Sequence, residues 1–194
     1  MPSYTQLYRN KEKCLCHKQN VDITETLENT AKSSIYGGFS NMIKILFVCH
    51  GNICRSPMAE FVMKDMVEKQ GLASEFYIAS AATSMEEIGN PVHYGTRNRL
   101  AQEGISVAGK YAVRMERSDY QKYDYLIGMD RWNYKNMLRI VGKDKANKIS
   151  LLLDYTDHPR DVADPWYTGD FEKTYQDVVA GCQGLLEKIK RERL

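Results

Sequence analysis

The sequence has no long hydrophobic run, almost no net charge and no obvious set of paired cysteines. None of its apolar stretches approaches the roughly 20 residues that a bilayer-spanning helix requires, so we expect no membrane partner. Its 27 basic and 25 acidic residues leave a net charge of +2, which is too small to indicate a nucleic-acid partner. The five cysteines show no disulfide framework, which favours a reducing, cytoplasmic location.

The first 41 residues differ in character from the rest of the chain. Residues 1–41 are polar, lack a sustained apolar period and lack the apolar core of a signal peptide. We therefore expect a flexible or accessory N-terminal extension, followed by a single domain over residues 42–194. Cys14, Cys16 and His17 lie close together in the extension, but three potential ligands without a fourth make a poor zinc site. We expect no metal and no cofactor.

Residues 42–194 alternate strand-like apolar runs with amphipathic helical segments. The patterns predict strands over 43–48, 76–82, 125–129 and 149–153, and helices over 56–70, 91–103, 130–141 and 171–191. Such alternation is typical of parallel strand pairing, so we expect an α/β fold, a three-layer doubly wound sandwich with a four-stranded parallel sheet in the flavodoxin-like order 2-1-3-4. Ligands bind these sheets outside the carboxyl ends of the strands, which is where the first strand reaches Cys49.

The loop after the first strand has the residues of an anion site. It runs from Cys49 to Pro57 with the sequence Cys-His-Gly-Asn-Ile-Cys-Arg-Ser-Pro. Backbone N–H groups of the loop and the positive end of the next helix converge there, so a phosphate or sulfate ion can bind. The same groups favour the thiolate form of Cys49. Arg55 carries a planar fork of donors that matches two phosphoryl oxygens.

The remaining loop residues suit that conformation. Gly51 permits close backbone approach and a positive φ, and Asn52 is the non-glycine residue that best tolerates a left-handed conformation. Ser56 can cap the helix and donate its hydroxyl to the sulfur, and Pro57 suits the first helical position. Together with Ile53 and Cys54, which complete the loop, these residues are the predicted phosphate-binding group.

This string resembles the signature of the low-molecular-weight protein tyrosine phosphatases. A second matching motif, Asp164-Pro165-Trp166-Tyr167, extends the resemblance over about residues 42–194. The resemblance implies hydrolysis of phosphotyrosine in a protein or peptide through a phosphocysteine, with Cys49 as nucleophile, Arg55 as phosphate clamp and Asp164 as general acid and then general base. A departing phenol needs a proton in the first step, which agrees with the role of Asp164. A turn-opening Asp-Pro is the alternative for Asp164, and Asp154, Asp157 and Asp161 compete with it.

Several residues around the loop have two possible roles. Trp166 and Tyr167 offer flat walls for a phosphotyrosine ring or are packing aromatics, and we expect His50 at the rim of the pocket. For Cys54 the resemblance implies a reversible disulfide with Cys49, while the alternative is a small residue packed beneath the loop.

The sequence also departs from the family pattern. Glu103 stands where many relatives have a histidine that braces the loop asparagine, while Ser80 matches a serine thought to contact the same asparagine. The cleft rim at 83–88 is acidic, which would disfavour strongly acidic peptides.

Three other functions remain as alternatives. Ile53 disfavours the related protein-arginine phosphatases, which typically have threonine there. An arsenate reductase would need further cysteines after the third strand, and none lies between Cys54 and Cys182. A non-catalytic phosphate-binding module would need no nucleophile or acid. Helical spacing predicts that Cys182 belongs to the core.

Overall fold

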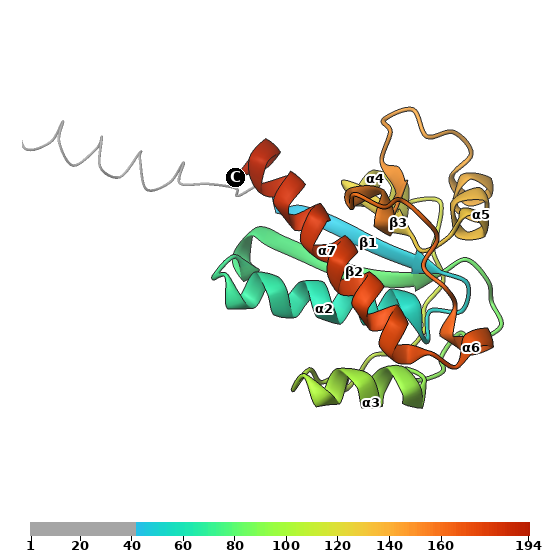
Figure 1. The fold of residues 1–194 in the computed structure, drawn as a ribbon. Coiled ribbons are helices and arrows are strands. Elements are labelled where there is room, and N and C mark those ends of the chain that lie inside the picture. The colour runs from blue at the N-terminus through green and yellow to red at the C-terminus, as the bar shows by residue number, and fades with distance from the viewer. Residues whose placement is uncertain (1–41) are drawn as a thin grey trace, which may run out of the picture. The chain divides into compact units, whose positions relative to one another are not determined.

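Four parallel strands form the centre of residues 42–194, the part of the chain that the computed structural model describes (Figure 1). The strands are β1 (Ile43–Cys49), β2 (Phe76–Ala82), β3 (Tyr125–Gly128) and β4 (Ile149–Leu151), and their order in the sheet is β2-β1-β3-β4. The predicted fold class and strand order are confirmed. Cys14, Cys16 and His17 lie outside the described residues, so the predictions for them stay predictions.

Helices cover both faces of the sheet, as a three-layer sandwich requires. In chain order the helical elements are α2 (Arg55–Lys69), η1 (Ala73–Glu75), α3 (Tyr94–Gln102), α4 (Asp119–Lys122), α5 (Arg131–Val141), η2 (Leu152–Tyr155), α6 (Pro165–Thr168) and α7 (Phe171–Arg193). The four long helices were predicted from the sequence, whereas η1, α4, η2 and α6 were not.

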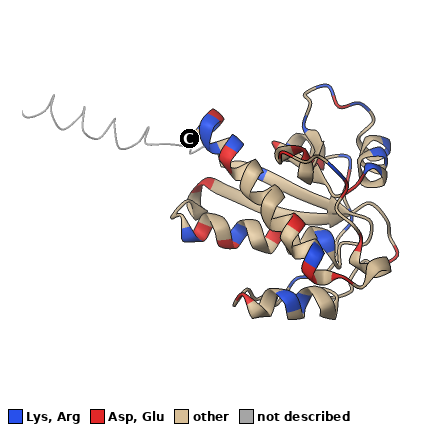
Figure 2. Cartoon of the chain, in the orientation of Figure 1, with Lys and Arg blue, Asp and Glu red and all other residues tan. Residues whose placement is uncertain are grey.

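The alternation of side chains along β1 explains why both faces are covered. Ile45 and Phe47 point into one core, formed with α2 and α7, which lie against each other in Figure 1. Leu46 and Val48 point to the opposite face and pack with residues of α5. A strand buried on both sides reads as a continuous apolar run, and the strands in Figure 2 are accordingly almost free of charge.

Caps account for the helix starts that differ from the predicted ones. Helix α3 begins at Tyr94, later than expected, because Pro91 pairs with Tyr111 in an isolated bridge and the His93 side chain accepts a hydrogen bond from the Gly95 N–H. Helix α5 begins after Asp130, whose carboxylate accepts a hydrogen bond from the Asn133 N–H at 2.6 Å. Each cap satisfies an N–H that has no partner within its helix.

The long C-terminal helix α7 closes the first core. Cys182 lies on its inner face, is fully buried and belongs to that core, as its helical spacing predicted. No helix within residues 42–194 combines the length and the apolar character needed to cross a membrane.

Candidate active site

A cavity of about 510 Å³ lies where the carboxyl ends of β1 and β3 meet. Cys49 lies at the end of β1 and Arg55 at the start of α2, while the turn after β3 contributes Asp130 and the N-cap of α6 contributes Asp164. Parallel strands bring their carboxyl ends to one edge, so residues far apart in sequence meet there. The sheet topology thus assembles the three predicted catalytic residues around one space.

Asn52 gives the loop its shape. It adopts the predicted left-handed conformation with φ 58°, and its backbone N–H donates to the Cys49 Sγ at 3.2 Å. Gly51 does not have a positive φ, so the expectation of one there is wrong. Its lack of a side chain serves close approach instead, because a Cβ on Gly51 would lie 3.0 Å from the Glu87 Cγ.

Helix α2 starts one residue earlier than expected. It begins at Arg55 after Cys54, so the predicted capping by Ser56 is wrong and Pro57 is the third helical residue. The second predicted contact of Ser56 is present, since its Oγ lies 3.0 Å from the Cys49 Sγ. Because the helix starts early, this hydroxyl lies within its first turn, where it contacts the sulfur instead of capping the helix.

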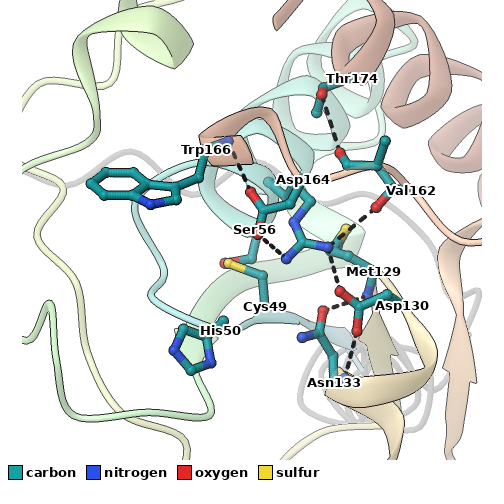
Figure 3. Close-up of polar contacts among 12 residues, drawn as sticks. Cys49, His50, Ser56, Met129, Asp130, Asn133, Val162, Asp164, Trp166 and Thr174 are labelled. Atoms are coloured by element: carbon teal, nitrogen blue, oxygen red, sulfur yellow. Dashed lines mark hydrogen bonds and ion pairs between the residues drawn. The ribbon is translucent and has the colours of Figure 1, made fainter. Parts of the chain in front are cut away.

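Arg55 is buried and held by acidic partners. Its guanidinium donates to the Asp130 carboxylate at 2.5 Å, to the Val162 carbonyl at 3.2 Å and to the Asp164 carboxylate, and Figure 3 labels these three acceptor residues. Burial alone would lower the pKa of Arg55, but the negative charges of Cys49, Asp164 and Asp130 raise it on balance. Arg55 therefore stays charged within the cavity.

Asp164 is both a helix cap and a member of the cavity. One carboxylate oxygen accepts a hydrogen bond from the Trp166 N–H at 3.1 Å, and the other faces Arg55 (Figure 3). Pro165 occupies the first position of α6, where its missing N–H costs nothing. The turn-opening and active-site interpretations of Asp164 are thus compatible.

Asp130 is a site residue that the sequence analysis missed. It caps α5 with one oxygen and binds Arg55 with the other. A signal was available, because Asp130 follows the third predicted strand just as Cys49 ends the first. Trp132, two residues further along the chain, also lines the cavity, is largely exposed and was likewise missed.

A chain of hydrogen bonds braces Asn52 from below. Its side-chain amide donates to Ser56 Oγ and to Ser80 Oγ, both at 2.8 Å, and its carbonyl oxygen accepts from the Val113 N–H at 3.1 Å. Ser80 therefore makes the contact that its position indicated. Glu103 instead pairs with Arg99 on the surface, so the asparagine is braced without it.

The mouth of the cavity is aromatic and acidic. Trp166 and Tyr167 line it and are exposed, so they are not packing aromatics of the core, and His93 meets Trp166 edge to face at 5.7 Å. His50 is half exposed at the rim, where its ring lies 3.1 Å from a Glu86 oxygen. Glu86, with Glu87 and Asp161, gives the rim negative charge.

Cys54 lies buried beside the nucleophile candidate. Burial and the negative charges of Cys49 and Asp164 raise the pKa of Cys54 to about 12. Cys54 is therefore a neutral thiol near neutral pH. Within residues 42–194 all cysteines are free, and no group of His, Cys, Asp or Glu is arranged to hold a metal ion.

Comparisons with known proteins agree with this geometry. The family model for low molecular weight phosphotyrosine protein phosphatase matches residues 44–194. The low molecular weight protein-tyrosine-phosphatase YfkJ of Bacillus subtilis is 42% identical over 154 residues, which are 78% of this chain and 99% of that protein. Its crystal structure has a TM-score of 0.77 and covers 81% of this chain and 100% of its own.

Two further relatives extend the match. The human low molecular weight phosphotyrosine protein phosphatase is 38% identical over 74% of this chain and 94% of its own. The crystal structure of the Streptococcus pyogenes enzyme has a TM-score of 0.68 at 42% identity, over 79% of this chain and 95% of that one. On sequence and structure alike, this chain belongs to the low molecular weight phosphotyrosine protein phosphatase family.

Proposed function

We propose that Cys49, Arg55 and Asp164 carry out the phosphotyrosine hydrolysis of this family in the present chain. The observation that supports this most directly is their convergence on one cavity, with two groups placed to stabilise a sulfur anion. The substrate is a phosphotyrosine protein or peptide, and the product phosphate occupies the loop amides. The mechanism follows from the contacts of each residue.

In the first step Cys49 attacks phosphorus and the bond from phosphorus to the phenolic oxygen breaks. The phosphoryl oxygens accept hydrogen bonds from the loop amides and from Arg55. To bind these oxygens, Arg55 gives up its contacts with Asp130 and Asp164. Asp164 gives its proton to the departing phenol, which would otherwise leave as a poor phenoxide. The products of this step are tyrosine and a phosphocysteine.

In the second step water attacks the phosphocysteine and the S–P bond breaks. Asp164, now a carboxylate, accepts the proton of that water. The Cys49 thiolate leaves with support from the Ser56 hydroxyl and the Asn52 N–H, so both steps use the same two contacts to the sulfur. Inorganic phosphate is released and Cys49 is restored.

The walls of the cavity favour an aromatic phosphoester over the alternatives. Ile53 is a buried, apolar lining residue, which suits an aryl ring better than the polar guanidinium of phosphoarginine. Cys182 belongs to the core and cannot serve a thiol relay, which argues against an arsenate reductase. A positioned acid beside the nucleophile argues against a non-catalytic module.

The acidic rim and the thiol chemistry support two finer expectations. Glu86 and Glu87 at the mouth disfavour strongly acidic peptides. The free thiols of Cys49 and Cys54 favour a reducing compartment, the cytoplasm, where a catalytic thiolate survives.

Hydrolysis of aryl phosphates with good and poor leaving groups tests the three roles. Cys49→Ser should abolish turnover, and Arg55→Lys should lower kcat/KM about a hundredfold because the bidentate fork is lost. Asp164→Ala should slow phenyl phosphate about a hundredfold or more and 4-nitrophenyl phosphate much less, since only the poorer leaving group needs the proton.

Asp130→Asn is the matched control, because Asp130 also binds Arg55 but does not adjoin the leaving group in the proposal. It should slow both substrates equally. Turnover of Cys49→Ser at the parental rate, or a leaving-group dependence that follows Asp130 instead of Asp164, would contradict the proposed roles.

A further inference from the structure

Lys110 is a cationic side chain outside the cavity that points into the sheet from the loop between α3 and α4. Its Nζ lies 3.1 Å from the Glu60 Oε2 and donates to the Ser80 carbonyl at 2.9 Å. The Lys110 side chain is 13% exposed and the Glu60 side chain only 5%. A carboxylate this deeply buried requires a charged or hydrogen-bonding partner, and Lys110 supplies one.

Glu60 is the far end of the hydrogen-bond chain that reaches the nucleophile. Ser80 Oγ donates to the Glu60 carboxylate at 2.5 Å, and Asn52 donates to Ser80 Oγ and to Ser56 Oγ. Ser56 Oγ lies 3.0 Å from the Cys49 Sγ. Lys110 is therefore linked to the sulfur through four intervening residues, although it does not line the active-site cavity.

The donor and acceptor groups along this chain fix the direction of each hydrogen bond, because the Asn52 Nδ2 only donates and its Oδ1 accepts from the Val113 N–H. A carboxylate only accepts, so the Ser80 hydroxyl must donate to Glu60 and accept from Asn52. The other amide hydrogen of Asn52 then occupies an acceptor site on Ser56. Ser56 keeps its own proton for the sulfur, since its other acceptor, the Ala81 carbonyl, is at 3.5 Å.

We propose that Lys110 is a positioning residue for catalysis, which holds the Glu60 carboxylate and the Ser80 backbone in place and so keeps the Asn52 amide and the Ser56 hydroxyl aligned with Cys49. This inference rests on the proposed function, in which the sulfur anion is both nucleophile and leaving group. Because Lys110 binds both the Glu60 carboxylate and the Ser80 carbonyl, it fixes the position of Ser80, whose hydroxyl accepts a hydrogen bond from Asn52. Glu103 takes no part in this network, since it binds Arg99.

A second lysine on the same carboxylate provides a matched control. Lys64 pairs with the other oxygen of Glu60 at 2.5 Å, but its side chain is 43% exposed, and its hydrogen bond and ion pair go to Glu60 rather than to Ser80. The Lys64 end of this i,i+4 pair is open to water, where such a pair contributes only a few tenths of a kcal/mol, so its loss should leave Ser80 and Asn52 in place. Comparing variants of the two lysines distinguishes the effect of removing any positive charge near Glu60 from the specific effect of removing Lys110.

The test compares Lys110→Met with Lys64→Met in the full chain. Methionine fits the site, because the Lys110 stem lines a second cavity with Ile105 and Val107. We expect Lys110→Met to lower kcat for 4-nitrophenyl phosphate about fivefold with little change in KM, the effect of weakening one hydrogen bond to the sulfur. Lys64→Met should match the parent, and Lys110→Arg should recover most of the loss.

The rate of Cys49 alkylation by iodoacetamide gives a readout that a purely structural role would not move. We expect the rate for Lys110→Met to fall about fivefold below neutral pH and to equal the parental rate in alkali, where the thiol is ionised in both proteins. The ionisable groups that face Cys49 are Arg55, Asp130, Asp164, Cys54 and the rim residue His50. The ionisable groups around Glu60 are Lys64 and Tyr123. The pKa of Tyr123 is raised by burial and by its neighbours Tyr77, Asp119 and Glu60. All of these groups are unchanged in the Lys110 variants, so the difference reports Lys110.

Three results would overturn the inference. They are a parental kcat and alkylation profile in Lys110→Met, an equal loss in Lys64→Met, and a loss confined to thermal stability. Should Lys110→Met not fold, Lys110→Leu, which also lacks a donor for Glu60 and for the Ser80 carbonyl, is held to the same expectations. A failure of the proposed function is a different outcome, because the parent itself would then lack hydrolysis that depends on Cys49.

Discussion

Arg55 has to serve two successive sets of partners. It is 3% exposed, and a buried guanidinium without acceptors would be strongly destabilising. Asp130 and Asp164 meet this need, and a phosphoryl group likewise presents oxygen acceptors that the guanidinium fork can bind in pairs. In the proposed mechanism, substrate binding exchanges the carboxylate oxygens for phosphoryl oxygens and releases Asp164 beside the phenolic oxygen that requires its proton.

Cys54 should protect Cys49 from irreversible oxidation. Peroxide converts the Cys49 thiolate to a sulfenic acid, and attack by the Cys54 sulfur on the Cys49 sulfur then forms a disulfide and releases water. The pKa of Cys54 is raised to about 12, first by burial and then by the charge of Cys49, so oxidation of Cys49 removes one of the causes. We expect dithiothreitol to restore most activity to the peroxide-treated parent and little to Cys54→Ser, as followed by turnover and intact mass.

Cys182→Ala is the control for this experiment, because Cys182 is a buried thiol of the core whose pKa is raised by burial alone. It should recover as the parent does. Equal recovery of Cys54→Ser and the parent, or an intact mass without the loss of two hydrogens on mild oxidation, would exclude the disulfide.

At the scale of elements, α7 approaches η2 through two glycines. A Cβ on Gly184 would lie 1.9 Å from the Tyr155 carbonyl oxygen, and one on Gly181 would lie 2.9 Å from the Leu152 carbonyl oxygen. Helix propensity favours alanine over glycine by about 1 kcal/mol, but overpacking against rigid backbone costs about 1–3 kcal/mol or more. We expect Gly184→Ala to lower the free energy of unfolding by about 2 kcal/mol and Tm by about 4–8 °C in a thermal melt.

Gln183→Ala gives the matching measurement on an exposed residue of the same helix. It should change the free energy of unfolding by less than about 0.5 kcal/mol. A Gly184→Ala variant as stable as the parent would show that α7 is free to shift away from η2.

The sequence predicts the type of most elements better than their ends. The apolar run 149–153 predicts one strand, but Leu152 and Leu153 leave the sheet and stay buried in η2, because an apolar run does not separate a strand from a buried turn. Helix α6 is missed because four residues carry no period, although its cap, Asp164 followed by Pro165, was recognised. Capping residues thus indicate where a helix starts, which hydrophobic periodicity alone does not.

At the scale of the molecule, the sequence points to the cavity residues that lie within a motif and misses those that only the strand order brings together. Cys49 and Arg55 lie in one loop, and the resemblance supplies Asp164, whereas Asp130 meets Arg55 only because β1 and β3 are neighbours. Glu60 and Lys110 give no signal at all. Glu60 is a charged residue within an ordinary amphipathic pattern, and its burial depends on the place where the 110–113 segment crosses the sheet end.

Residues 42–194 should be sufficient for activity, and this is the expectation that concerns the whole chain. Every residue proposed for catalysis and both packed cores lie in this range, and the family match begins at residue 44. A protein that starts at Met42 should therefore keep kcat/KM within about twofold of the full chain and a Tm within about 2 °C, because all of these residues are retained. Steady-state hydrolysis of 4-nitrophenyl phosphate and a thermal melt measure both quantities. Cys49→Ser in the shortened protein must be inactive, which shows that the same site is being measured, and a loss of most activity on truncation would instead assign residues 1–41 a part in catalysis.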